Sequence, residues 1–157
     1  MILIAHRGNT NGPTIHENQP LYLLEAIESG YDVEIDVWFI GGRLWSGHDK
    51  AEYLIDNKFV ESIYEKAWFH CKNIAAAQFL SMSQLPINYF WHESDEYTIT
   101  SSGLIWANVG HPGGLNTVCV LPEKTDLVME RSWYGICSDY VDEIKKRQAT
   151  SSSLPNL

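Results

Sequence analysis

Short apolar runs recur along the chain, and most of them end in polar residues. Runs of this kind predict buried strands. The expected strands cover residues 1–5, 31–40, 43–49, 68–73, 87–94, 103–110, 116–123 and 134–140. Helices are expected between several of them, over residues 21–30, 51–67, 73–85, 124–133 and 142–149. Because strands alternate with helices, the pattern predicts an α/β fold with a parallel sheet.

Side chains that could take part in catalysis or bind a metal lie at the C-terminal ends of several expected strands, among them His6, His70 and Asp139. Such residues converge on one point when the sheet closes, as it does in a (β/α)8 barrel with its active site at the C-terminal face. A typical barrel needs about 250 residues, and this chain has 157. We therefore expect a compact (β/α)8 TIM-type barrel with some crossover helices shortened or missing. An open doubly wound sheet is the structural alternative.

The segment YDVEIDVWFI carries two acidic residues in an otherwise apolar strand. Glu34 and Asp36 lie two positions apart, so both face the same side of the strand, roughly 6.5 to 7 Å apart along it. Two carboxylates this close repel each other unless a cation lies between them or one of them takes a proton. A hard divalent cation with oxygen ligands, Mg²⁺ or Ca²⁺, fits this pair best. The alternative is an amphipathic strand with a solvated acidic face.

Two histidines bracket this acidic pair in the sequence. His6 precedes Arg7, whose planar donor fork suits phosphate oxygens. His48 precedes Asp49, which would orient the imidazole or cap the next helix. Two histidines that flank a metal-held phosphate could act as general base and general acid. A single histidine at a strand end is more often structural, but two in these contexts favour catalysis.

Composition limits the partners and the compartment. The net charge of −9 argues against a nucleic-acid partner and against electrostatic binding to membranes. No apolar run approaches the ~20 residues that span a bilayer, so no stable membrane association is expected. Three widely spaced cysteines indicate free thiols in a reducing compartment, and we expect a cytoplasmic protein. Residues 1–148 would form one domain and residues 149–157 a flexible tail; the oligomeric state is open.

The motifs AHRG, ENQP with EAIESGYDVEIDV, and GGRLWSGHD span residues 4–49. In this order they resemble the N-terminal signature of the glycerophosphodiester phosphodiesterase family, which reads H-R-G, P-E-N-T, an E-x-D strand, a D-G turn and H-D. HCKN and GICSDYVDEI are weaker matches to the family's E-x-K strand and to its last strand. The family is similar to phosphatidylinositol-specific phospholipase C and contains metal-dependent phosphodiesterases on a (β/α)8 barrel.

The resemblance implies a role for each residue that matches a family motif. The acid–base pair would be His6 and His48, the phosphate ligands Arg7 and Lys72, and the ligands of Mg²⁺ or Ca²⁺ Glu34 and Asp36. Glu17 and Asn18 match P-E-N-T and would support the site from the first loop. In the family the attacking oxygen can be the substrate's own neighbouring hydroxyl.

One departure concerns the metal. The family's third carboxylate, the Glu of E-x-K, is His70 in this chain. Imidazole is a poor Ca²⁺ ligand and suits softer transition metals. Either the two carboxylates hold the ion with help from water or Glu93, or the metal differs. His92 and Glu93 would form a wall of the site, the alternative being a polar surface loop.

The sequence therefore predicts metal-dependent hydrolysis of a small phosphodiester of the glycerophosphodiester type. The alternative in another class is a degenerate barrel that binds a phosphate-containing ligand without hydrolysing it. A sugar-phosphate phosphatase would act on monoesters instead. A zinc enzyme that uses His6, His48, His70 and His92 would leave the acidic pair without a role. The alcohol of the substrate is open.

Overall fold

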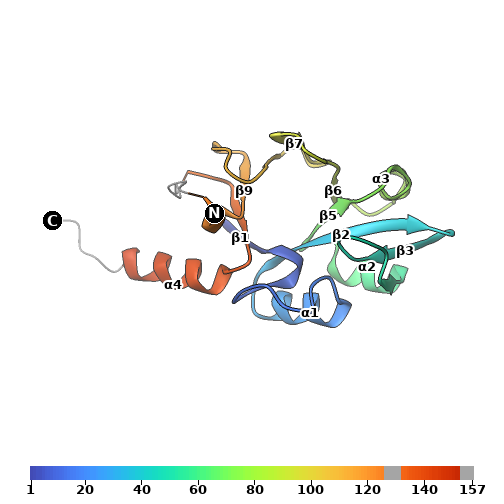
Figure 1. Cartoon of the computed structure of the whole chain (residues 1–157), viewed down its shortest axis with the longest axis horizontal. Helices are drawn as coiled ribbons and strands as arrows, with labels where there is room; N and C mark the ends of the chain where they lie inside the picture. The colour runs from blue at the N-terminus through green and yellow to red at the C-terminus, as the bar shows by residue number, and fades with distance from the viewer. Residues whose placement is uncertain (126–131, 153–157) are drawn as a thin grey trace.

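The computed structural model describes residues 1–125 and 132–152, and its core is one mixed sheet of ten strands (Figure 1). The strands are β1 (Ile2–Ala5), β2 (Asp32–Ile40), β3 (Arg43–Ser46), β4 (Tyr53–Ile55), β5 (Ala67–Cys71), β6 (Asn88–Phe90), β7 (Tyr97–Ile99), β8 (Ile105–Ala107), β9 (Thr117–Val120) and β10 (Gly135–Ser138). The helices of the described residues are α1 (Pro20–Glu28), α2 (Asn57–Ile63), α3 (Ile74–Ser81), α4 (Val141–Ser152) and the 3₁₀-helices η1 (His6–Gly8) and η2 (Pro122–Lys124).

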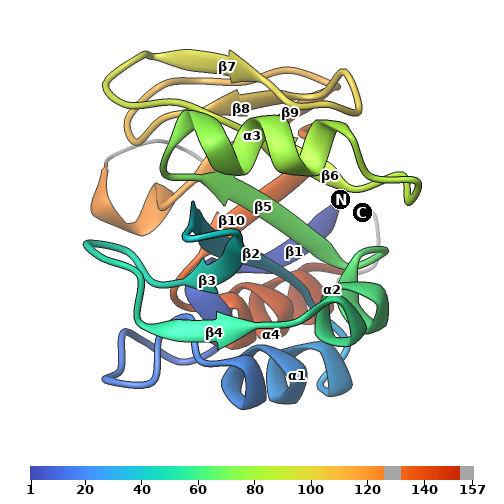
Figure 2. The same ribbon diagram turned by 90° about the vertical axis from the view of Figure 1, so that its right-hand side faces the viewer.

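Parallel pairing dominates the sheet. Neighbouring strands run parallel along the path β6, β5, β2, β1, β10, β9 and β8. The exceptions are β3 and β4, which extend β2 as an antiparallel meander, and β7, which pairs antiparallel with β8. The sheet curls into a half-barrel (Figure 2). A 2.8 Å backbone hydrogen bond from Ser101 N to Tyr89 O joins the loop after β7 to β6.

The predicted (β/α)8 barrel is wrong. Only four α-helices occur in the described residues, and three strand pairings are antiparallel. The segment between Phe90 and Gly135 holds three strands and no α-helix in its described part. The connection from Ala107 to Thr117 is shorter than the dozen or more residues that a helical crossover needs. The chain thus keeps the parallel strands of a closed barrel's wall but lacks most of its outer helical layer.

The helices cover the outer face of the sheet around β2. Because side chains alternate along a strand, Val33, Ile35 and Val37 all point to this face, and each is fully buried. They form one apolar cluster with Leu23 of α1 and Leu80 of α3. Burial of each such side chain stabilises the fold by about 1.5 to 3 kcal/mol. This packing fixes the register of β2 and hence the direction of its acidic residues.

The inner face of the curled sheet carries a second apolar cluster. Ile4, Trp68, Phe90, Trp106 and Val118 are its main buried members. The ring centroids of Phe90 and Trp106 lie 4.4 Å apart in a stacked arrangement, and those of Trp68 and Trp106 lie 5.8 Å apart. These side chains fill the curl below the C-terminal strand ends, so polar groups on the inner face gather above them.

Several predicted elements and boundaries differ in the structure. Tyr53–Ile55 is a strand, although residues 51–67 were expected to be helical, because it pairs with β3. Tyr97–Ile99 pairs with β8, although its polar surroundings predict a loop. Helix α4 continues to Ser152, past the expected start of the tail, and residues 153–157 lie outside the described residues. Most of the helix expected at 124–133 also lies outside them.

Among the helices of the described residues, none has the length and apolar character needed to cross a membrane.

Candidate active site

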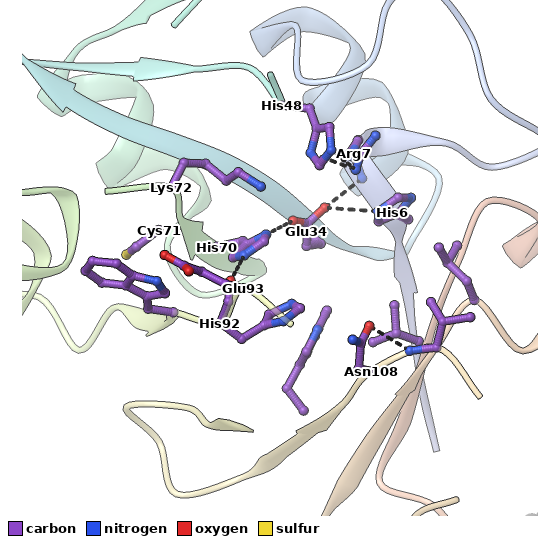
Figure 3. Close-up of a pocket in the computed structure, with 15 residues that line it drawn as sticks. His6, Arg7, Glu34, His48, His70, Cys71, Lys72, His92, Glu93 and Asn108 are labelled. Atoms are coloured by element: carbon purple, nitrogen blue, oxygen red, sulfur yellow. Dashed lines mark hydrogen bonds and ion pairs between the residues drawn. The ribbon is translucent and has the colours of Figure 1, made fainter. Parts of the chain in front are cut away.

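A cavity of about 280 Å³ opens at the C-terminal ends of the parallel strands (Figure 3). Its lining combines polar and apolar side chains. The charged residues and histidines are His6, Arg7, Glu34, His48, His70, Lys72, His92 and Glu93, and the remaining lining residues are Cys71, Trp91, Trp106, Asn108, Val109, Val120 and Leu121. Residues that were expected at the site therefore come together from four strand ends and from the β3–β4 loop.

The acidic pair lies inside the protein. Glu34 and Asp36 are 2% and 0% exposed, so a solvated acidic face is excluded. Both project from the inner face of β2, and the parallel register sets Asp36 opposite His70 of β5. Glu34 lines the cavity and lies between His6 and His70 in Figure 3. A buried carboxylate needs partners that stabilise its charge, and the surrounding side chains supply them.

One oxygen of Asp36 has three partners, two from the β1–α1 connection and one from the β3–β4 loop. Oδ2 accepts a hydrogen bond from Asn18 Nδ2 at 3.0 Å and forms an ion pair with Arg7 Nε at 3.0 Å. His48 Nδ1 lies 3.1 Å from the same oxygen. The backbone N–H of Asp36 also donates to Asn18 Oδ1 at 2.9 Å, so the asparagine binds this residue in two places.

The other oxygen of Asp36 faces β5. Oδ1 lies 3.0 Å from His70 Nδ1 and 3.5 Å from Lys72 Nζ. Burial disfavours the charge of Asp36, but hydrogen bonds from His48 and His70 outweigh it, and they hold the pKa of this carboxyl well below its usual value. The carboxylate is therefore ionised throughout the physiological range.

The H-R-G motif forms η1 and aims its arginine across the site. Arg7 has a left-handed backbone conformation with φ 54°, and its N–H donates to Glu34 Oε2 at 3.1 Å. Its guanidinium contacts Glu17 at 3.1 Å and His48 at 2.8 Å. Burial opposes the charge of Arg7, yet the nearby carboxylates raise its pKa. Gly8 follows with φ 88°, and a Cβ there would lie 2.8 Å from the Tyr22 ring, so a larger residue would clash.

The first loop braces the site through two residues that match P-E-N-T. Glu17 accepts hydrogen bonds from Arg7 Nη1 and, at 2.8 Å, from Asn9 Nδ2. Asn18 adopts φ 63° and accepts a 2.7 Å hydrogen bond on its carbonyl from Ser46 Oγ. Asparagine tolerates this left-handed conformation better than most residues, which lets the loop turn its amide toward Asp36.

His6 is oriented by a carboxylate from the far end of the chain. Its Nδ1 lies 2.7 Å from Oδ1 of Asp139, which follows β10. The other ring nitrogen, Nε2, lies 4.0 Å from Glu34 Oε2 on the cavity side. Burial disfavours the charge of Asp139, but the hydrogen bond with His6 outweighs it and lowers the pKa of this carboxyl. A carboxylate on Nδ1 leaves Nε2 free to exchange a proton in the cavity.

Two residues support the site in ways that the sequence did not predict. Asp139 stands at a strand end, which singled it out, but nothing in the sequence connected it to His6. Asn9 donates to Asp139 at 2.9 Å and accepts from Tyr22 Oη at 3.2 Å. No motif marks Asn9, because its role depends on loops that meet only in the folded chain.

His70 is held at both ring nitrogens and by two neighbouring aromatic rings. Its Nδ1 lies 3.0 Å from Asp36 Oδ1 and 3.6 Å from Glu34 Oε1, and its Nε2 lies 3.3 Å from the backbone oxygen of His92. The ring stacks against Phe90, 5.0 Å away, and against the His92 ring, 4.7 Å away, and these two rings lie 6.0 Å from each other. Burial disfavours its charge, but hydrogen bonds to the two carboxylates raise its pKa to about 9.

His92 has the opposite electrostatic setting. Burial lowers its pKa to about 4, and the nearby positive charges of His70 and Lys72 add to this effect. Its imidazole is therefore neutral at neutral pH. It forms part of the cavity wall together with Glu93, whose side chain is exposed at the rim.

Glu34, Asp36 and His70 offer ligand atoms that all lie within 4.8 Å of one another. Two carboxylate oxygens and one imidazole nitrogen form a donor set that suits a divalent metal ion. The donors are buried on adjacent strands, so little rearrangement is needed to bring them onto one ion. These residues thus fit a metal centre.

One expected site residue lies apart from the others. The side chain of Asp49 is 94% exposed, and its Oδ1 is 3.7 Å from His48 Nε2. The α2 helix is capped by Asp56, which accepts from Phe59 N at 2.8 Å, so Asp49 does not cap it. Asp49 therefore makes only a weak contact with His48 at the surface.

Comparisons with models of known protein families, with curated proteins and with solved structures returned no match in any of the three searches.

Proposed function

We propose that this protein hydrolyses a small phosphodiester, with His6 and His48 as the acid–base pair and a divalent cation held by Glu34 and Asp36. One observation carries the proposal. The imidazoles of His6 and His48 and the Arg7 guanidinium line the same cavity as the buried Glu34, and the buried Asp36 contacts Arg7 and His48 directly behind it. The resemblance of residues 4–49 to the glycerophosphodiester phosphodiesterase signature supports the same chemistry.

The phosphate would bind between basic groups of the cavity. Arg7 offers guanidinium N–H groups, and Lys72 offers an ammonium group from the end of β5. Both groups would stabilise the negative charge on the non-bridging phosphate oxygens. The substrate already carries this charge, and it is redistributed in the transition state. A bound divalent cation would supply further charge stabilisation and would lower the pKa of a coordinated oxygen.

The two histidines would divide the proton transfers. His6 is suited to be the base, because Asp139 occupies its Nδ1 and leaves Nε2 facing the cavity. It would take the proton of the attacking oxygen as the new P–O bond forms. His48 lies beside Arg7 with a side chain 39% exposed, and it would protonate the leaving alkoxide as the old P–O bond breaks. Each transfer is worth roughly 10²- to 10⁴-fold in rate.

Hydrolysis of glycerophosphoglycerol, a diester whose alkoxide leaving group must be protonated, tests the proposal. We expect His6→Ala and His48→Ala each to lower kcat by roughly 10²- to 10⁴-fold while circular dichroism stays unchanged. His111→Ala is the matched control, because His111 contacts Tyr97 outside the cavity. Full activity in either site variant would overturn the acid–base roles. Turnover of a p-nitrophenyl monoester but not of the diester would select the phosphatase instead.

A second function, binding of a phosphate-containing ligand without turnover, is favoured by one observation. Asp36 already has five basic or amide partners, so its charge is stabilised without an ion. Calorimetry with glycerophosphoglycerol in the presence of EDTA separates the two functions. Metal-independent binding with no hydrolysis in any metal would favour the binding domain over the enzyme.

A further inference from the structure

We propose that the centre formed by Glu34, Asp36 and His70 selects a divalent transition metal of the Co²⁺ or Zn²⁺ class over Mg²⁺ and Ca²⁺. The inference deepens the proposed function, since it concerns the same site. It rests on how the fold presents His70.

The backbone places the imidazole among the ligands. Because β2 and β5 pair in parallel with Asp36 opposite His70, their side chains project from the same inner face. His70 Nδ1 lies 3.0 Å from Asp36 Oδ1 and 3.6 Å from Glu34 Oε1. Ligands at about 2.0 to 2.2 Å from one transition-metal ion would be spaced by about this much. The centre therefore cannot take an ion onto both carboxylates without setting it beside the imidazole.

The second ring nitrogen has a partner that supports the tautomer needed for metal binding. His70 Nε2 lies 3.3 Å from the backbone oxygen of His92, so a proton on Nε2 has an acceptor. The lone pair of the neutral ring then points from Nδ1 toward the carboxylates. Metal-binding histidines commonly donate their other N–H to a carbonyl or carboxylate in this way. Stacking against Phe90 and His92 fixes the plane of the His70 ring, so Nδ1 already points toward the two carboxylates.

The other groups nearby do not favour a hard ion. Ca²⁺ takes six to eight oxygen ligands, but apart from Glu34 the charged residues and histidines that line the cavity are mainly basic, and the other acid among them, Glu93, is exposed. The charges of Arg7 and Lys72 repel every divalent cation equally, so they do not choose among metals. The choice is made by the donor atoms, and imidazole favours transition metals.

The test uses the full chain stripped of metal with EDTA. Isothermal titration calorimetry with Mn²⁺, Co²⁺, Zn²⁺, Mg²⁺ and Ca²⁺ measures each dissociation constant. We expect one site that binds Co²⁺ and Zn²⁺ at least tenfold more tightly than Mg²⁺ or Ca²⁺. His70→Glu, which replaces the imidazole by a carboxylate, should narrow that ratio at least tenfold. Bound Co²⁺ should also show a visible absorption band that shifts in this variant.

His111→Glu is the matched control and should leave the metal preference unchanged. Circular dichroism checks the fold of both variants, and if His70→Glu does not fold, His70→Asn takes its place. Mg²⁺ or Ca²⁺ bound as tightly as Zn²⁺, or no ion bound, overturns the inference. So does an unchanged ratio in a folded His70 variant. Transition-metal selectivity without diester hydrolysis would uphold this inference and overturn the proposed function, so the two failures are distinguishable.

Discussion

His70 shows how one residue can serve two electrostatic purposes at the same position. Without a metal, its imidazolium lies between Glu34 and Asp36 and compensates their charges. With a metal, the proton must leave Nδ1 so that the nitrogen can bind the ion. Proton and metal therefore compete for one atom, and the buried carboxylates have a cationic partner in both states.

This competition predicts a pH dependence of stability in EDTA. The pKa of His70 rises from 6.5 to about 9 on folding. A raised pKa contributes stability that is fully present below pH 6.5 and is lost as pH rises toward 9. The loss should be on the order of 3 kcal/mol. Urea denaturation between pH 6 and 9.5 measures it, and His70→Gln should flatten that part of the profile. If the free energy of unfolding depended on pH equally in the wild type and in His70→Gln, His70 would not be protonated in the folded protein.

Strand β2 is the element that connects the core to the site. Its residues alternate between an outer face packed against helices and an inner face that carries the carboxylates. The apolar half holds the strand in register, and a shift by one residue would turn the acidic half outward. Stability and chemistry thus depend on different side chains of one strand, and they can be changed separately.

Two neighbouring substitutions test this separation. Ile35→Ala should lower the free energy of unfolding by about 2 to 5 kcal/mol, with or without metal, because Ile35 is fully buried among helix-facing residues. Glu34→Gln should instead remove the additional stabilisation that a saturating ion gives, about 2.7 kcal/mol at a hundredfold excess over Kd. Thermal denaturation with and without metal compares them. A Glu34→Gln protein that metal stabilises as strongly as wild type would contradict the ligand role.

The sequence predicted β2 well because its evidence is local. The alternation of apolar and acidic residues around Ile35 predicts which side chains of β2 face each side of the sheet. The two glycines after Ile40 predict the turn into the return strand β3. It failed for β4 and β7, whose three residues each are strands only because a partner lies alongside. The His6–Asp139 contact joins residues 133 positions apart, and no local pattern reports such a pairing.

At the scale of the whole molecule, the predicted barrel is wrong, but most of the expected site residues still lie close together. A closed (β/α)8 barrel was expected because residues at many strand ends converge when a sheet closes. The half-barrel brings the same strand ends together by curling, and the aromatic cluster around Trp106 fills its interior. Curvature alone therefore suffices to gather these side chains around a cavity, and the missing outer helices do not affect it.

The central claim is that this curled sheet forms one metal-dependent phosphodiesterase site. The most direct test is the initial rate of bis(p-nitrophenyl) phosphate hydrolysis by EDTA-treated protein as Mn²⁺, Zn²⁺, Mg²⁺ or Ca²⁺ is restored. The account predicts almost no turnover in EDTA and recovery that saturates near one equivalent of a bound ion. Undiminished hydrolysis in EDTA, or no hydrolysis with any of these ions, would contradict it.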